Sequence, residues 1–429
     1  MSDDLSPPFS DCPRCNNKSY GILAIYPELN SQNSILAKGC SYCRHHQLSN
    51  LPHISKKIIY LDQNAISNLQ FAANTNSPKH QKAILDGWQT LFNKLNKLIK
   101  YNLIICPYSD IHVLESVPTT EFHNLQHFQE ILSGMITFSH HNLVEDIQVK
   151  KYFKNYILGK IDSEALIEEI DCFDIYPHSW YMKSKAIDEF RLDFPLKNEE
   201  VEEVKNANIK AHNQLEESTY LRWKNRDSKK FEELVLEEAT AFGNEKLWWF
   251  AKYYRYIKGL RENTAIEEMV KPPAFDLISE LIKIAKSNSS NIILKDFFNS
   301  KSILNVPCIR ISSEYFASIA RKLNKDSKNR YPRKSNPSPG MLSDSVSLST
   351  FLPYCDAFFT DNENYALFQE KPLKIEKKKY NTEIFSKRNM DEFIEYLENI
   401  WLNANKLHLN LVREIYDEKW LNSSEINFF

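Results

Sequence analysis

Glycine is scarce in this chain, with 8 residues among 429, and neither sign of charge predominates. The scarcity argues against a glycine-rich loop that cradles phosphates, because such a loop needs several closely spaced glycines. With 54 basic and 56 acidic residues the formal net charge is -2, so any nucleic-acid binding must be regional. No apolar run approaches the roughly 18 residues of a membrane helix, and the start resembles no signal peptide. We expect a soluble, cytoplasmic protein without membrane contact.

Cysteine is also sparse, and its placement is informative. The 8 cysteines are too few for a disulfide scaffold in a chain of 429 residues, a length that predicts two or three structural units. Half of them form two Cys-x-x-Cys pairs. We expect the others to be buried thiols, since they lie in or beside apolar or aromatic runs: Cys106, Cys172, Cys308 and Cys355.

Residues 1–50 carry the two cysteine pairs, Cys12 with Cys15 and Cys40 with Cys43, each beside β-prone residues. Two such knuckles that converge on one tetrahedral ion form a zinc ribbon, and a closed four-cysteine site predicts structural Zn²⁺. Disulfides are the alternative, which a cytoplasmic location disfavours. His45 and His46 are possible substitute ligands.

The pattern of residues 51–118 predicts the first half of an α/β domain. The apolar strand at 58–61 ends in Asp62, and an amphipathic helix opened by Ser77-Pro78 leads to a second strand at 102–107. Ser109 can then cap a short helix at 110–116 that carries Glu115. This order predicts a strand, a helix and a parallel strand.

Long charged helical segments follow, and we assign residues 119–303 to a helical insertion. Its predicted helices cover 199–224, 229–258 and 274–286. Residues 304–388 would be the second half of the α/β domain, with a strand at 306–311, a helix at 313–323, a basic loop and a late acidic block. Residues 389–429 would form a C-terminal helix and tail. The two halves are expected to share one sheet.

Four carboxylates come from four separate elements: Asp62 after a strand, Glu115 on a helix, Asp344 at a helix start and Asp361 after the strand at 357–360. Each has an ordinary alternative, as a helix cap, a solvated side chain or a turn residue. Together they suit a hard divalent cation, because clustered carboxylates repel one another unless a cation offsets their charge.

These motifs resemble the PIN-like (PilT N-terminus) nuclease superfamily. The resemblance rests on the strand ending in Asp62, the Ser-led helix with Glu115, and Asp344 and Thr360-Asp361 around a helix and a strand. The late block at 343–362 is the most specific part of the resemblance, and within it the phrase at 352–361 looks like members with a Leu-Pro-Tyr-Cys-Asp turn before the last strand. The whole resemblance covers about residues 58–118 and 305–388. It implies a PIN-like three-layer parallel sheet split by a helical insertion.

The resemblance also implies the chemistry. Asp62, Glu115, Asp344 and Asp361 would hold Mg²⁺ or Mn²⁺ for phosphodiester hydrolysis, with Asn64 and Thr360 as orienting neighbours. Asp356 departs from the common pattern, as an extra ligand or a helix-terminus cap. Most relatives with this acid pattern act on RNA, which implies an endoribonuclease. A toxin or anti-phage role is an analogy at the level of the fold.

Two other interpretations compete with the nuclease. In haloacid-dehalogenase-type phosphatases the strand acid is followed two residues later by a second acid, but that position is Asn64 here. The second alternative is an inactive zinc-ribbon adaptor that binds nucleic acid or a protein partner through the ribbon or the insertion. Retention of all four acids argues against an inactive relic.

Basic side chains gather before Asp344, and this loop is expected to contact the phosphate backbone. The aromatic and basic run at 248–258 suits base stacking, although core packing is the favoured interpretation. The ribbon offers further bases for nucleic acid or a protein partner. The predicted contact residues are Arg321, Lys322, Lys325, Lys328, Arg330, Arg333 and Lys334 in the loop, and Arg14, Lys18, Lys38 and Arg44 in the ribbon.

Overall fold

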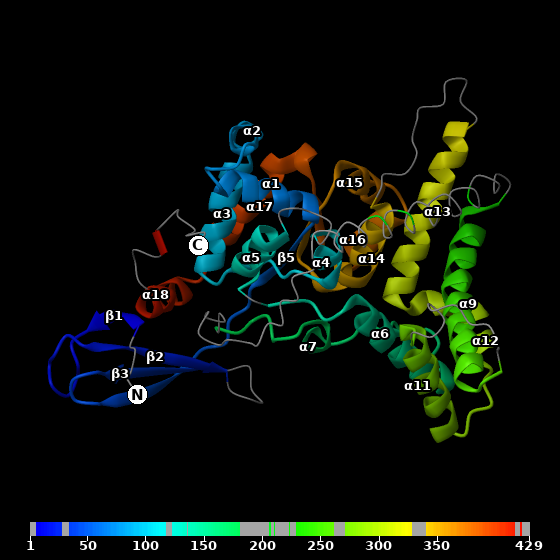
Figure 1. Cartoon of the computed structure of the whole chain (residues 1–429), viewed down its shortest axis with the longest axis horizontal. Helices are drawn as coiled ribbons and strands as arrows, with labels where there is room; N and C mark the ends of the chain where they lie inside the picture. Colours follow the sequence, from blue (N-terminus) through cyan, green and yellow to red (C-terminus); the bar gives the residue numbers. More distant parts are fainter. Residues whose placement is uncertain are drawn as a thin grey trace.

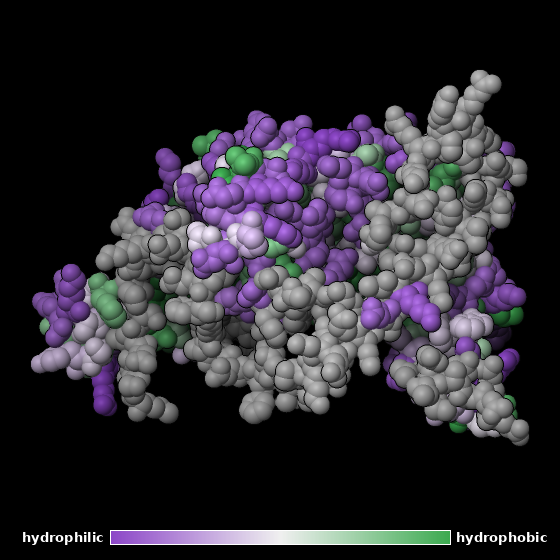
Figure 2. All heavy atoms as spheres, turned by 45° about the horizontal axis from the view of Figure 1, so that its top comes forward, coloured by the Kyte–Doolittle hydropathy of each residue, from purple (hydrophilic) through white to green (hydrophobic). Residues whose placement is uncertain are grey.

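The computed structural model describes residues 6–27, 34–116, 122–134, 136–180, 229–260, 271–327, 340–416 and 421–422, together with residues 206, 210 and 223. Within this part of the chain, the ribbon lies at one end, a parallel sheet with its helices in the middle, and α9, α11, α12 and α13 at the other end (Figure 1). The face seen in Figure 2 is mostly hydrophilic where residues are described, with hydrophobic residues in small separate areas.

The N-terminal sheet is antiparallel, in the order β1-β2-β3-β4. It consists of β1 (Ser6–Ser10), β2 (Tyr20–Pro27), β3 (Ser34–Cys40) and β4 (His46–Leu51). Ile22, Leu36 and Leu51 of this sheet belong to the same hydrophobic core as the helices beside the parallel sheet. The ribbon is therefore packed onto the rest of the protein through apolar contacts.

The second sheet is parallel and joins segments from both sides of the helical region. Its order is β6-β5-β7-β8, with β5 (Lys57–Leu61), β6 (Ile104–Ile105), β7 (Ala357–Phe359) and β8 (Glu383–Phe385). This order confirms that the chain before the helical region and the chain after it share one sheet. Residues 57–61 also pair directly with both neighbours.

Both faces of this sheet are covered, which explains its continuous apolar strands. Ile59 and Leu61 point into a core with α1, α3, α5, α17 and α18. Ile58 and Tyr60 point into a second core with α6, α13, α14, α15 and α16. The first layer comprises α1 (Gln63–Ala73), α2 (His80–Leu85), α3 (Trp88–Lys100), α5 (Phe122–Ser133), η3 (Lys387–Asn389), α17 (Met390–Leu402) and α18 (Lys406–Ile415).

The opposite layer and the helical region form the remaining elements. A third core fills the space between α6, α9, α11, α12 and the start of α13. The bounds are α4 (Asp110–Ser116), α6 (His141–Ile157), α7 (Glu169–Cys172), α9 (Phe231–Ile257), α11 (Pro273–Ser287), α12 (Leu294–Asn299), η1 (Lys301–Asn305), α13 (Pro307–Ser327), α14 (Met341–Phe351), η2 (Leu352–Tyr354), α15 (Asn362–Gln369) and α16 (Leu373–Lys379).

The structure corrects two predicted elements. The apolar run at 306–311 is not a strand, because Pro307 begins the long helix α13, which also contains the helix predicted at 313–323. Proline suits the first turn of a helix, and a short apolar run does not by itself distinguish a buried strand from a buried helix. The single helix predicted after Ser77-Pro78 is two helices, since Gly87 at φ +86° separates α2 from α3.

Four further predicted helices have different outcomes. α9 and α11 confirm the helices expected at 229–258 and 274–286. The helix expected at 199–224 falls almost entirely outside the described residues. The C-terminal amphipathic helix is confirmed as α17, whose Phe393 and Leu397 are buried.

Candidate functional site

The order of the parallel strands places a topological switch point at their carboxyl ends. β5 is the first of these strands in the sequence, and its neighbours are the second strand on one side and the third on the other. The connection after β5 therefore leads to the strand on one side, and the later connection into β7 leads to the other side. In open α/β sheets the ligand crevice lies at such a switch point. Asp62 follows β5 directly, and Asp361 follows β7 by one residue.

Asp62 and Asp361 are held in matching local geometry. Each is the N-cap of the next helix: Asp62 Oδ1 accepts the Ala65 N–H at 2.7 Å, and Asp361 Oδ1 accepts the Asn364 N–H at 2.7 Å. The backbone also joins the two strand ends, since Asp62 N donates to Phe359 O at 2.9 Å. Capping therefore coexists with a position at the crevice, because each cap uses only one carboxylate oxygen.

Glu115 and Asp344 reach the same region from α4 and from the first turn of α14. Burial, and then the charges of Asp361 and Glu115, together raise the pKa of Asp344 to about 7. The pKa of Asp62 is raised well above its ordinary value by burial, and then by Asp344, Asp361 and Glu115. Burial also raises the pKa of Glu115 to about 7, against hydrogen bonding with Ser343. The structure thus brings the four acids into mutual electrostatic contact.

No lysine or arginine is among the main influences on these three pKa values. The carboxylates are half-buried and repel one another, so a cation of hard character fits their chemistry. They are more widely spaced than the ligands of a closed cage, since they form no described group of three or more ligand atoms within 4.8 Å.

Two buried side chains that support this site were missed by the sequence analysis. Asn364, 2% exposed, accepts a hydrogen bond from Tyr315 Oη at 2.6 Å and donates to Thr360 Oγ1 at 3.3 Å. Asn364 also hydrogen-bonds Asp344, which lowers the pKa of that acid against burial. The spacing Asp361-x-x-Asn364 was a local signal for the cap, whereas Tyr315 on α13 had none.

Of three other predicted neighbours of the acids, the structure keeps only Thr360 beside them. Asp356 lies before β7, at the amino end of the sheet, where Oδ1 pairs with Lys57 Nζ at 2.6 Å and Oδ2 accepts the Ile58 N–H at 2.8 Å. It is therefore neither a ligand at the crevice nor a helix cap. Asn64 is exposed, and its amide oxygen accepts a hydrogen bond from Asn68 at 2.9 Å. Thr360 remains beside them, through Asn364.

The predicted phosphate-binding loop is only partly described. Arg321 is engaged by the chain itself: its guanidinium donates to Lys371 O at 3.2 Å and lies 4.8 Å from the Phe231 ring centroid. Lys322 is exposed on α13. The side chain of Lys325, and the residues Lys328, Arg330, Arg333 and Lys334, lie outside the described part.

The four paired cysteines form a second site, in the ribbon. All eight cysteines are free thiols, which excludes the disulfide alternative here. The sulfurs of Cys12, Cys15, Cys40 and Cys43 lie within 4.8 Å of one another, and the Cys12–Cys43 and Cys15–Cys40 separations are 3.6 and 3.7 Å. Tetrahedral Zn²⁺ with ligand bonds of about 2.3 Å would set its sulfurs roughly 3.8 Å apart. The group can therefore bind a metal such as zinc.

The two cysteine turns repeat one backbone pattern. Cys12 N donates to Asn17 O and Cys40 N to His45 O, both at 2.9 Å, and each turn closes on a residue at positive φ, Asn16 or Arg44. A hydrogen bond from Ser19 lowers the pKa of Cys40 to about 6, which favours the thiolate that a metal needs. His45 stacks on Tyr20 instead, and neither His45 nor His46 belongs to this cluster.

A third group of ligand-type side chains is explained by hydrogen bonds alone. Asp110 accepts the backbone N–H of His141 at 3.2 Å and also contacts both the His141 ring and, at 3.3 Å, His140 Nε2. His140 Nδ1 accepts the Asn142 N–H at 3.3 Å, which puts the proton on Nε2. That nitrogen then has no lone pair for a metal, so the contacts describe a cap that joins α4 to α6.

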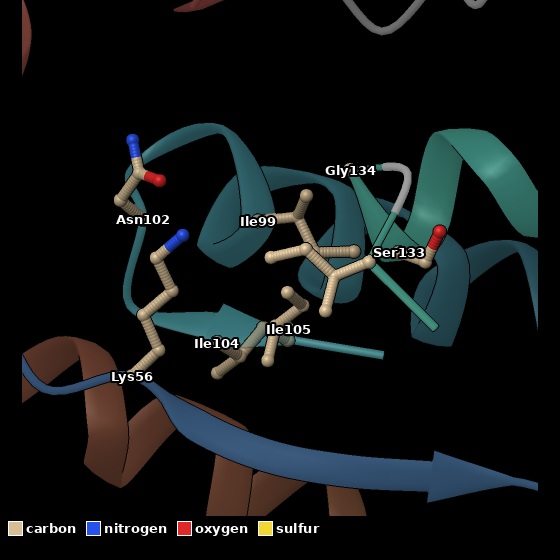
Figure 3. Close-up of a pocket in the computed structure, with 8 residues that line it drawn as sticks. Lys56, Ile99, Asn102, Ile104, Ile105, Ser133 and Gly134 are labelled. Carbon is tan, nitrogen blue, oxygen red and sulfur yellow. The ribbon is translucent and has the colours of Figure 1, made fainter. Parts of the chain in front are cut away.

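A small cavity lies at the amino end of the sheet, away from the acids. Its volume is about 10 Å³, and Figure 3 shows Lys56 and Asn102 at one side, with Ile99, Ile104 and Ser133 nearby. Lys56 is 4% exposed, and burial alone lowers its pKa to about 7. The space holds roughly one water molecule, so it is no substrate site.

Comparison of the chain with protein-family models, with curated proteins and with solved structures finds no match. Among the helices of the described ranges, none has the length and apolar character needed to cross a membrane.

Proposed function

We propose that this chain is a metal-dependent nuclease of PIN-like type that hydrolyses phosphodiester bonds in RNA, with structural Zn²⁺ in its ribbon. The observation that carries the proposal is the convergence of Asp62, Glu115 and Asp344 with Asp361 at the switch point of a parallel sheet, with raised pKa values and no basic side chain among their main influences. The preference for RNA rests on the resemblance.

The roles of the residues follow from how they are held. Asp62 and Asp361 are fixed by their helix caps, and Asn364 holds Thr360 and Asp344 in one network, so the acids are preorganised before substrate arrives. A bound Mg²⁺ or Mn²⁺ would activate the attacking water and stabilise the departing oxygen. The four carboxylates would hold the ion.

The experiment measures cleavage of labelled single-stranded RNA, structured RNA and single-stranded DNA in Mg²⁺ or Mn²⁺. Asp62→Asn and Asp344→Asn are tested beside wild type, with Asp356→Asn as the matched control because that carboxylate lies at the other end of the sheet. We expect cleavage of RNA by wild type and the control, and a loss of at least about 100-fold in the two site variants.

The second candidate is an inactive adaptor, favoured by a four-cysteine site in a ribbon that packs onto the domain through Ile22, Leu36 and Leu51. Its signature would be a wild-type protein that cleaves none of the three polymers and whose thermal stability is unchanged by Mn²⁺. A metal site stabilises the folded state by mass action, whereas a relic does not. Equal cleavage by wild type and both site variants would instead point to a contaminating nuclease.

A further inference from the structure

The two halves of α9 have different surroundings. Leu234, Val235, Glu238 and Ala239 are buried in its first half, but beyond Gly243 no residue of α9 is buried. The helix passes close to α12 at Gly243, since a Cβ there would lie 2.4 Å from the side chain of Phe298. The core packing predicted for residues 248–258 is therefore confirmed only in part: Phe250 packs against the third core, whereas Trp248 and Tyr254 are exposed.

Only one stripe of the second half packs on the protein. The rings of Phe250 and Tyr253 lie 5.2 and 5.0 Å from the ring of Phe275 on α11. On other faces, 53% of Trp248 and 43% of Tyr254 are exposed. Residues 246–260 contain six aromatic residues and no acid. Among their bases, Lys246 is half-buried and its Nζ lies 3.9 Å from a carboxylate oxygen of Glu145, which leaves Lys252, Arg255 and Lys258 for the surface.

Bases and aromatic rings alternate on this surface instead of occupying separate faces. Lys252 Nζ lies 4.3 Å from the Trp248 ring centroid and 5.3 Å from that of Trp249, and Lys258 Nζ lies 5.6 Å from that of Tyr254. The two tryptophans meet edge to face, with centroids 4.8 Å apart. Each exposed ring therefore has a cation beside it.

We propose that this aromatic-basic surface, residues 246–260, binds single-stranded nucleic acid. Bases would stack on Trp248 and Tyr254, and Arg255 and Lys258 would contact the phosphates. A helix that lies on a membrane separates its apolar face from its basic face, which this surface does not do. The inference extends the proposed nuclease by naming where its polymer is held, but binding is measured without cleavage.

The test is fluorescence anisotropy of a labelled single-stranded oligo(U) without Mg²⁺ or Mn²⁺, so that binding is observed alone. We expect Trp248→Ala with Tyr254→Ala to weaken binding by roughly tenfold or more. Trp248→Phe, which keeps a ring, should stay near wild type. Leu85→Ala is the matched control, since Leu85 is an exposed apolar residue on α2. Arg255→Ala with Lys258→Ala should reduce the salt dependence of binding.

The inference would be overturned if the Trp248→Ala, Tyr254→Ala protein bound the oligonucleotide with unchanged affinity. It would also be overturned if the wild type bound vesicles with anionic lipid more tightly than the oligonucleotide and this variant lost the vesicle binding. Failure here is separable from failure of the proposed function. A wild type that binds the oligonucleotide through this surface but cleaves nothing refutes the nuclease alone. If the wild type cleaves RNA but the Trp248→Ala, Tyr254→Ala variant binds the oligonucleotide normally, only the inference about this surface is refuted.

Discussion

His112 Nε2 lies 2.7 Å from the carbonyl oxygen of Leu61, the residue directly before Asp62. The Ser109 N–H donates to His112 Nδ1 at 2.9 Å, so the ring proton is on Nε2 and donates to Leu61. This side chain thereby joins the helix that carries Glu115 to the strand that ends in Asp62. Its ring also stacks on Tyr60, with centroids 4.8 Å apart.

Replacing His112 should disturb both stability and site geometry. Burial lowers its pKa to about 4, so folded protein keeps it neutral while unfolded protein protonates it near 6.5. His112 therefore makes stability fall as pH drops from about 6.5 to 4. We expect His112→Leu to cost about 2 kcal/mol at pH 7 and to remove that pH dependence. Urea unfolding across this pH range measures it, with His127→Gln as a half-exposed control.

Asp344→Asn should stabilise the protein in metal-free buffer. Because the folded pKa values of Asp344 and Glu115 are about 7, unfolded protein loses these protons at lower pH, and stability falls as pH rises from about 4 to 7. Removing one charge should raise the unfolding free energy by about 1–3 kcal/mol at pH 8. The same variant should lose the stabilisation by Mn²⁺. A wild type that melts identically with and without Mn²⁺ would count against the site.

Asp356→Asn should leave metal binding intact. Its ion pair with Lys57 is partly exposed, and an amide oxygen can still accept the Ile58 N–H, so the cost should stay below about 1 kcal/mol. Mn²⁺-dependent shifts in melting temperature should match wild type, whereas Asp361→Asn should reduce them. An equal loss of the Mn²⁺-dependent shift in Asp356→Asn and Asp361→Asn would indicate that Asp356 does bind the metal.

The ribbon should carry one Zn²⁺ per chain. Native mass spectrometry of Cys40→Ser should show loss of the ion, because the thiolate favoured by Ser19 is gone. Cys172→Ala, which removes a buried thiol outside the cluster, should retain it. A wild type without zinc, or a Cys40→Ser protein that retains it, would refute this assignment.

Lys56→Met should stabilise the fold near neutral pH. The pKa of Lys56 is about 7 when folded and 10.5 when exposed, so between these values the unfolded chain binds more protons and stability rises with pH. We expect a gain of about 2 kcal/mol or more at pH 7 that disappears toward pH 10.5. Chemical denaturation at several pH values tests it. Lys94→Met, at a partly exposed position, should change stability by less than about 0.5 kcal/mol.

Much of the fold was accessible from local pattern. The strand ending in Asp62, the cysteine turns and α17 each follow from neighbouring residues, since β-branched runs, Cys-x-x-Cys spacing and helical periodicity act over short distances. The strand predicted at 306–311 failed because its apolar residues suit a helix buried on most sides equally well.

The sequence by itself determined which carboxylates follow strands and begin helices, because strand ends and helix caps depend on residues that are neighbours in the sequence. Only the tertiary structure decided which of them meet. The order β6-β5-β7-β8 puts Asp62 beside Asp361 and leaves Asp356 at the other end, while Tyr315 reaches Asn364 from α13. These contacts join residues far apart in the chain, so they depend on strand order and helix packing, which no local pattern specifies.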